Sequence, residues 1–256
     1  MTKDITRQYM NLLAMLAALT VNILSNTLPL NDLSTGEISD RFRVYFVPAG
    51  YVFSIWGIIY VGWIAFLIFQ FRQSQKASPR MRALGYWFAL SCVFNAAWLF
   101  CWHYERLGLS VLVMLALLAT LITSYLRLNV NRQRVGTAER WSVDIPFGLY
   151  LGWISVAAVA NISDYLYYVQ WNAFGLAPQV WAVIMLAIAS LLGLGMALTR
   201  RDAAYVFVLV WAFVGIAVKQ SAAPLVGNSA WAAAAIALAL AAWSIVQRGR
   251  SAGTPE

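Results

Sequence analysis

The residues best suited to bind a ligand in this sequence are its tryptophans, of which there are twelve. Trp56, Trp63, Trp98 and Trp153 lie deep inside long apolar runs. An indole offers a large flat face and one N–H donor, and a buried N–H needs a polar partner. These four residues indicate either a pocket for a flat aromatic ligand or close packing between helices. Residue type alone does not choose between these two interpretations.

Two asparagines accompany the deep tryptophans at helical spacing. Asn95 lies one turn before Trp98, and Asn161 lies eight residues after Trp153. Residues separated by whole turns share one face of a helix. Each asparagine is therefore expected on the same face as its tryptophan, where the amide could hydrogen-bond inside an apolar environment.

Other residue types indicate little catalytic chemistry. The single histidine, His103, lies near the end of an apolar run and is expected at a membrane interface rather than as a ligand or proton carrier. One histidine cannot supply a His-rich metal site, and the sequence has no P-loop and no Gly-x-Gly-x-x-Gly motif. We therefore predict no catalytic residue and no metal site, and an enzyme is not the favoured class.

Charged residues near the apolar runs have structural interpretations. Lys219 is expected to extend toward water, because a Schiff-base lysine would need a counter-ion that its own helix does not offer. Asp164 is expected to face a loop. Asp144 precedes Pro146 and suits the polar start of a helix.

The elements that must position these residues follow from composition. The chain has 256 residues, of which 62% are hydrophobic and 11% are charged. Soluble proteins are nearer half apolar and a quarter charged. The apolar runs are about 17–25 residues long, as a helix needs to cross about 30 Å of hydrocarbon, and they lack the alternation of barrel strands. We predict an all-α, polytopic transmembrane bundle.

Turn residues divide the apolar sequence into about eight predicted spans. The first is expected to be retained rather than cleaved as a signal peptide, since no small-x-small site precedes Pro29. Tryptophans near predicted span ends are expected to form aromatic belts: Trp102, Trp141, Trp171, Trp181, Trp231 and Trp243. The spans are 8–28, 49–71, 82–104, 107–128, 144–169, 178–199, 203–221 and 229–247.

Lys and Arg residues are concentrated in every second segment that joins these spans, and therefore on one side of the membrane. Of the 18 Lys and Arg residues, fourteen fall on the side of the N-terminus and four on the other. The four are Arg41, Arg43, Arg106 and Lys219. Cytoplasmic loops are enriched in Lys and Arg, so both termini are predicted to be cytoplasmic. The net charge of +8 is explained in the same way, and no nucleic-acid partner is expected.

The longest predicted outer loop, Pro29–Val47, contains Ser34 followed three residues later by Glu37. This is a capping-box pattern, which predicts a short helix within the loop. A loop of this length in a compact bundle often acts as a lid.

Three ordered motifs in the first 170 residues resemble the TspO/MBR family, the tryptophan-rich sensory proteins related to the mitochondrial translocator protein. The segment Pro48–Tyr60 is similar to the family's Pro-Pro-x-Trp-Val-Phe-x-x-Val-Trp-x-x-x-Tyr motif, although Ala49 and Tyr51 depart from it. Asn95 and Trp98 match an Asn-x-x-Trp motif. A Trp-x-x-x-Ala-x-x-x-Asn motif is matched by Trp153, Ala157 and Asn161.

The resemblance implies a five-helix bundle over residues 1–170, with a ligand cavity below the first loop. Residues 171–256 would add three transmembrane helices and a short cytoplasmic tail. The family motifs assign ligand contacts to the following side chains: Trp56, Asn95, Trp98, Trp153, Ala157 and Asn161.

By the same resemblance, the ligand would be a flat apolar molecule such as a porphyrin or another tetrapyrrole, with no cofactor required. The expected function is ligand binding or sensing. The alternatives are a transporter of a small amphipathic molecule and a porphyrin-modifying enzyme. The expected setting is a lipid bilayer, as a multi-pass protein of the bacterial inner (plasma) membrane that could form a homodimer.

Overall fold

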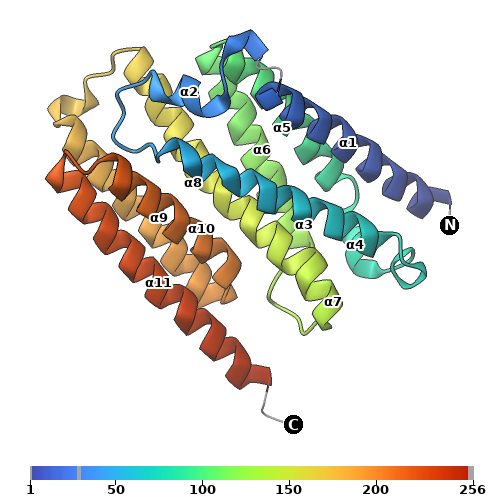
Figure 1. Ribbon diagram of the computed structural model, residues 1–256. Coiled ribbons are helices and arrows are strands. Elements are labelled where there is room, and N and C mark those ends of the chain that lie inside the picture. The colour runs from blue at the N-terminus through green and yellow to red at the C-terminus, as the bar shows by residue number, and fades with distance from the viewer. Residues whose placement is uncertain (1, 28–29, 253–256) are drawn as a thin grey trace.

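The computed structural model describes residues 2–27 and 30–252, and the regular elements in these ranges are all helical. Eight long helices run roughly along a common axis (Figure 1). They are α1 (Thr2–Thr27), α3 (Ile55–Gln70), α5 (Trp87–His103), α6 (Leu107–Arg127), α8 (Ile145–Tyr168), α9 (Pro178–Arg200), α10 (Ala203–Lys219) and α11 (Pro224–Ala252). Each corresponds to one of the spans predicted from sequence.

The helices have the length and composition of a membrane protein. Within the described residues, six are long and apolar enough to cross a membrane: α1, α3 with the turn before it, α6, α8, α9 and α11. The remaining two, α5 and α10, are apolar helices of 17 residues. Large apolar side chains are exposed along the other seven helices, as expected for surfaces that contact lipid, whereas α8 is largely buried and exposes only Tyr167 and Tyr168 at its end. The protein is thus an all-α polytopic membrane bundle.

Several predicted boundaries were wrong, including the start of the first span, since α1 begins at Thr2 rather than at residue 8. The third span is broken, because α4 (Pro79–Leu84) ends at Gly85, whose φ of +59° reverses the chain before α5 begins. The last helix begins at Pro224, which occupies its first turn, where proline is favoured, rather than at residue 229. Pro29, the expected end of the first span, lies outside the described residues.

Five of the helices form a closed ring. Around it, α1 packs on α5, α5 on α6, α6 on α8, α8 on α3, and α3 on α1. The other three helices pack together, and α10 joins them to the ring by lying against α8. Gly152 makes this approach possible, because a Cβ there would lie 3.0 Å from the Tyr205 carbonyl oxygen.

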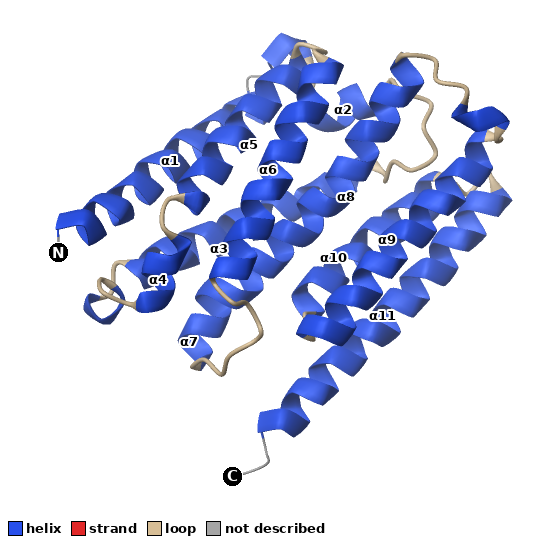
Figure 2. Cartoon of the chain, turned by 180° about the vertical axis from the view of Figure 1, so that it is seen from behind, coloured by secondary structure: helices blue, strands red, loops and turns tan. Residues whose placement is uncertain are grey.

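Short elements gather at the two ends of the bundle (Figure 2). One end, called here the lid end, carries η1 (Leu30–Asp32), α2 (Thr35–Asp40) and η5 (Ala173–Gly175). Residues 30–47, which include η1 and α2, are called here the lid. The turn η2 (Gly50–Ser54) leads from the lid into α3. The opposite end, the terminal end, carries both chain ends, η3 (Gln73–Gln75), α4, α7 (Thr137–Glu139) and a π-turn, η4 (Arg140–Asp144).

Buried ion pairs hold the terminal end together. Arg80 pairs with Asp144 and with Glu139, and its Nε donates to the Leu128 carbonyl at 2.7 Å. Asp144 directly precedes α8, at the helix start where it was predicted, but it makes no capping hydrogen bond. The buried side chain serves instead as the partner of Arg80, because the π-turn continues directly into α8 and leaves no open helix end at this position.

Candidate ligand cavity

A cavity of about 450 Å³, called here the chamber, lies at the lid end between the ring helices and the lid. Its walls come from α2, from the segment that leads through η2 into α3, from α5 and from α8. Its lining residues are Thr35, Ser39, Val47, Pro48, Phe53, Trp56, Trp98, Trp102, Trp153, Val156, Ala157, Ala160, Asn161 and Asp164. This figure includes space open to the surroundings, and the part that water-sized occupants could fill is only about 30 Å³. Small-molecule sites typically measure about 300–1,000 Å³, so a ligand would require the chamber to widen.

Most of the residues predicted from the family motifs meet in this chamber. Trp56, Trp98, Trp153, Ala157 and Asn161 all line it. The sixth, Asn95, does not. Its Oδ1 accepts a hydrogen bond of 2.6 Å from Asn22 of α1, whose own Oδ1 accepts from the Tyr60 hydroxyl at 2.7 Å. Asn95 therefore belongs to a polar cluster that links α1, α3 and α5.

One face of α8 supplies six of the fourteen residues that line the chamber. Trp153, Ala157, Asn161 and Asp164 occupy positions i, i+4, i+8 and i+11 of this helix. At 3.6 residues per turn these positions form one continuous stripe. The small side chain of Ala157 leaves open the space between the indole at one end of the stripe and the polar groups at the other.

The tryptophan rings that line the chamber form one stacked pair and two edge-to-face pairs. The Trp98 and Trp102 rings are stacked, with centroids 5.8 Å apart and planes inclined by 22°. The Trp153 ring lies edge-on to Trp56 at 6.4 Å and to Phe53 at 5.7 Å. Such edge-to-face pairs are favoured by the ring quadrupoles. Flat faces and ring edges thus both border the chamber.

Trp102 is a chamber residue that sequence reasoning missed. Its position near the end of α5 predicted an aromatic belt, but its side chain is 3% exposed. The indole N–H donates to the Thr35 carbonyl of the lid at 3.2 Å. The prediction was wrong because the lid folds over this helix end. The spacing of four residues from Trp98 was the signal that could have revealed it.

Three polar atoms in the chamber have no hydrogen-bond partner among the described residues. They are Nε1 of Trp98, Nδ2 of Asn161 and Oδ1 of Asp164. The Asn161 Oδ1 accepts from the Ser110 hydroxyl at 2.9 Å, which fixes the amide so that its NH₂ group is the unpaired part. Because buried polar groups are normally paired, the chamber offers two N–H donors and one carboxylate oxygen to an occupant.

Two predictions about residues near helix ends were wrong. Asp164 was expected to face a loop, yet it is 1% exposed and lines the chamber. His103 was expected at a membrane interface, yet it is fully buried, and its Nδ1 hydrogen-bonds the Leu99 carbonyl at 2.8 Å. Both helix ends are covered by other segments of the chain, which sequence position alone does not reveal.

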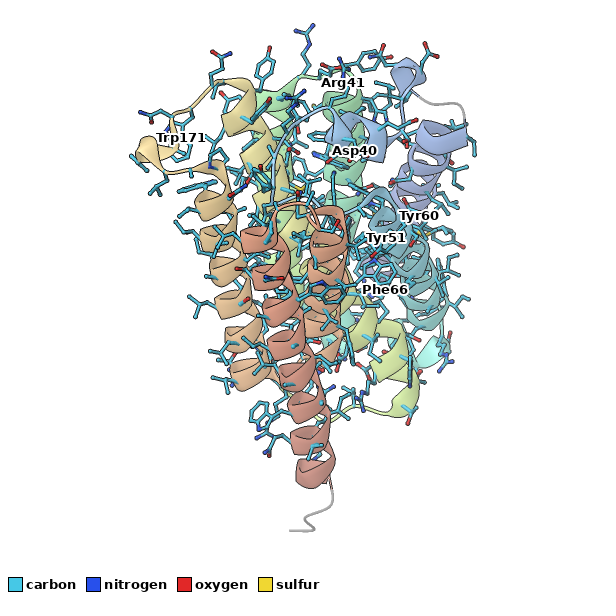
Figure 3. The ribbon with its side chains drawn as sticks, turned by 60° about the vertical axis from the view of Figure 1, so that its left-hand side comes forward. Asp40, Arg41, Tyr51, Tyr60, Phe66 and Trp171 are labelled. Atoms are coloured by element: carbon cyan, nitrogen blue, oxygen red, sulfur yellow. The ribbon has the colours of Figure 1, made fainter. Side chains whose placement is uncertain are left out.

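The lid is not an irregular loop but contains a capped helix, α2. The predicted capping box is present: the Glu37 N–H donates to the Ser34 hydroxyl oxygen at 3.3 Å, and the Ser34 N–H donates to the Glu37 carboxylate at 2.7 Å. These hydrogen bonds hold the pKa of Glu37 below its ordinary value. At the other end of α2, Asp40 pairs with Lys219 and Arg41 pairs with Glu105. Figure 3 shows Asp40 and Arg41 above Tyr60 and Phe66, at the lid end.

Comparison with known proteins identifies the family. A model of a family described as TSPO-like protein matches residues 8–243. The chain belongs to this family. No curated protein and no solved structure matches it. The match to the TSPO-like family runs through α9, α10 and α11 as well as through the ring, and the division into regions 1–170 and 171–256 stays a prediction.

Helix α10 of this TSPO-like protein, which lies outside the five-helix ring, contributes directly to the lid. Besides the ion pair of Lys219, the Gly215 carbonyl of α10 accepts from the Ala49 N–H at 3.1 Å. The Trp211 indole donates to the Val52 carbonyl at 2.9 Å. Helix α10 therefore fixes both α2 and the turn that carries Phe53 into the chamber. The predicted exposure of Lys219 to water is partial, with 25% of its side chain accessible.

A wider groove adjoins the chamber on the side of α1. Thr35, Phe53 and Trp56 line both spaces, so the two share a wall. The groove has a volume of about 1,060 Å³, which includes space open to the surroundings. Its own lining includes Asn22, Glu37, Asp40, Ser54 and Tyr60. The chamber itself is narrow, so a bulky occupant would have to extend into this groove.

Proposed function

We propose that this TSPO-like protein is a membrane ligand-binding or sensory protein whose chamber binds a flat, mainly apolar molecule. The proposal rests on the convergence of Trp98 and Trp102 from α5 with Trp153 from α8 around one cavity. Stacking of a flat ring system on one indole is worth about 1–3 kcal/mol, by analogy with bases on aromatic side chains. Several indoles around one cavity favour a ligand with an extended π-system.

A tetrapyrrole is the first candidate ligand, on the basis of the family resemblance. A substituted macrocycle would need the chamber and the groove together, with Trp56 at the boundary between them. The two unpaired N–H donors in the chamber suit acceptor groups at the edge of such a ligand. The ligand is proposed as an occupant and not as a group required for folding.

The direct test is porphyrin titration of purified protein, followed by tryptophan fluorescence quenching. The variants are Trp98→Phe, Trp153→Phe, the double substitution and Trp243→Phe. Trp243 serves as the matched control because it lies on α11, away from the chamber, and is 36% exposed. Each chamber substitution should weaken binding by roughly 5- to 150-fold, toward the lower end because phenylalanine keeps some ring area. Thermal unfolding of each variant would verify folding.

Two results would count against the proposal. Equal losses in all four variants would mean that the porphyrin partitions onto the apolar surface instead of entering the chamber. Absence of binding by folded wild-type protein would leave the family resemblance as one of fold alone. Loss of the porphyrin absorbance only under illumination would support the porphyrin-modifying alternative.

Transport of a small amphipathic molecule is the second candidate, and Asp164 is the observation that favours it. Intramembrane carboxylates commonly mark substrate or ion pathways. Asp164 lies four residues before the end of α8, however, rather than at its middle. Ligand flux in proteoliposomes, compared between wild type and Asp164→Asn, would separate transport from binding. The proposed setting is the bacterial inner membrane with both termini cytoplasmic, and a homodimer is compatible with it.

A further inference from the structure

Asp164 distinguishes the chamber from a purely apolar aromatic pocket. Among the described residues that line the chamber it is the only acidic one. Its side chain is 1% exposed, and its Oδ1 has no hydrogen-bond partner in the described part of the protein. A buried carboxylate oxygen without a partner is costly, because it has lost its hydration and gained nothing in return.

No basic residue of the described chain neutralises this carboxylate by direct contact. The ion pairs within residues 2–27 and 30–252 do not include Asp164. Lys219 is the basic group whose charge is felt at Asp164, and its ammonium is paired with Asp40 of the lid. Among the described residues, no cluster of three or more His, Cys, Asp or Glu side chains could hold a metal ion. A cation from outside the chain, or a proton on the carboxyl group, would relieve this cost.

The surroundings of the carboxylate suit an organic cation. The faces and edges of Trp98, Trp102 and Trp153 border the same cavity. Aromatic faces attract cations through the ring quadrupole, and a box of such rings is the usual recognition site for ammonium groups. A carboxylate beside aromatic walls thus offers a charged partner and a polarisable lining to a positively charged nitrogen.

We propose that the chamber selects flat aromatic ligands that carry a protonated nitrogen, with Asp164 as its partner. This inference rests on the proposed function and names the ligand class within it. The same carboxylate disfavours anionic groups in the chamber. The unpaired N–H groups of Trp98 and Asn161 remain available to an acceptor on the same ligand.

The test compares three acridines that share one ring system and differ in charge. Protonated 9-aminoacridine is a cation, acridine is neutral, and acridine-9-carboxylate is an anion. Each is titrated at neutral pH into wild-type protein in nanodiscs of zwitterionic lipid, with empty nanodiscs as the blank for partition into lipid. Wild-type protein should bind the cation roughly 10- to 100-fold more tightly than the neutral ring, as expected for a charge-assisted hydrogen bond, and the anion most weakly.

Two substitutions locate the origin of the preference. Asp164→Asn keeps the size of the side chain and removes its charge, so the cation should lose its advantage while the affinity for neutral acridine changes little. Glu105→Gln is the matched control, because this acid also lies at the lid end but does not line the chamber. The control should retain the full preference for the cation. The comparison of the three ligands on wild-type protein stands even if Asp164→Asn fails to fold.

The outcomes separate this inference from the proposed function. Equal affinities of wild-type protein for the cation and for neutral acridine would overturn the inference. If neutral acridine also binds more weakly to Trp153→Phe, the proposed function still stands. A cation preference that persists in Asp164→Asn would overturn it as well, because a residue other than Asp164 would then bind the positive charge. If no acridine binds folded wild-type protein, this inference fails, and the porphyrin titration decides the proposed function separately.

Discussion

Lys219, the last residue of α10, forms an ion pair with Asp40, the last residue of the lid helix α2. The two residues are separated by 179 positions in sequence. The pair ties the lid to α10, a helix outside the five-helix ring, so α10 takes part in closing the chamber.

Removal of this ion pair should loosen the lid with little effect on the fold. Lys219→Met is expected to cost about 0.2–1 kcal/mol of stability, as for other partly exposed pairs, and to speed hydrogen exchange in residues 35–40. Lys219→Arg should preserve the wild-type exchange rate because it keeps the charge. Unchanged exchange in Lys219→Met would show that the backbone contacts of α10 hold the lid without the ion pair. A chromophore lost in Lys219→Met and released by hydroxylamine would support the Schiff-base alternative instead.

Membrane orientation is predicted from the distribution of basic residues. The structure places the four basic residues Arg41, Arg43, Arg106 and Lys219 at or beside the lid end, as the eight-span prediction requires. Reporter fusions after Gln133 and after residue 250 should therefore report the cytoplasm, and a fusion after Trp171 the outside. A C-terminal reporter found outside would contradict the predicted orientation of the whole bundle.

Trp102 should be as important to ligand binding as the tryptophans found from sequence. Trp102→Phe removes the hydrogen bond to the Thr35 carbonyl and part of the stack on Trp98. We expect the loss of this hydrogen bond to lower the free energy of unfolding by about 0.5–1.5 kcal/mol. We also expect weaker porphyrin binding. Trp231→Phe is the control, since Trp231 is exposed on α11. Equal behaviour of the two variants would argue that Trp102 has no role in the chamber.

The terminal end should be far more sensitive to charge removal than the lid end. Asp144→Asn removes the more buried of the two carboxylates that pair with Arg80 and leaves only Glu139. Loss of one partner of a buried ion pair typically costs about 3–5 kcal/mol, and the remaining pair with Glu139 should keep the cost toward the lower end. Glu105→Gln breaks the more exposed pair with Arg41 and should cost less than about 1 kcal/mol. Denaturation in the same detergent measures both. Similar stabilities for the two variants would mean that the Arg80 pair contributes little.

The packing of α10 on α8 should depend on Gly152. A Cβ at this position would lie 3.0 Å from the Tyr205 carbonyl oxygen and 3.1 Å from the Val208 Cβ, so Gly152→Ala should push the helices apart and lower the melting temperature. Gly195→Ala is the matched control, because a Cβ there meets nothing within 4 Å and alanine favours the helix. A Gly152→Ala variant as stable as the control would show that α10 adapts without strain.

The sequence by itself determined the features that depend on local signals. Apolar length placed a helix at each of the eight predicted positions, and Ser34 with Glu37 predicted the capping box that begins α2. Helical periodicity placed Trp153 and Asn161 near one face of α8, and the family motifs added Trp56, Trp98 and Ala157, all of which line the chamber. These predictions succeeded because helix length, capping and periodicity are properties of neighbouring residues.

The tertiary structure alone decided which helix ends are covered and which charges meet. Trp102, His103 and Asp164 lie near helix ends, where exposure is the usual outcome, and become buried because other segments fold over them. Asp144 and Lys219 acquired their roles from Arg80 and Asp40, which lie far away in the chain. The burial of a side chain and the identity of its ionic partner are set by segments distant in sequence. A pattern confined to a few turns of one helix carries no information about them.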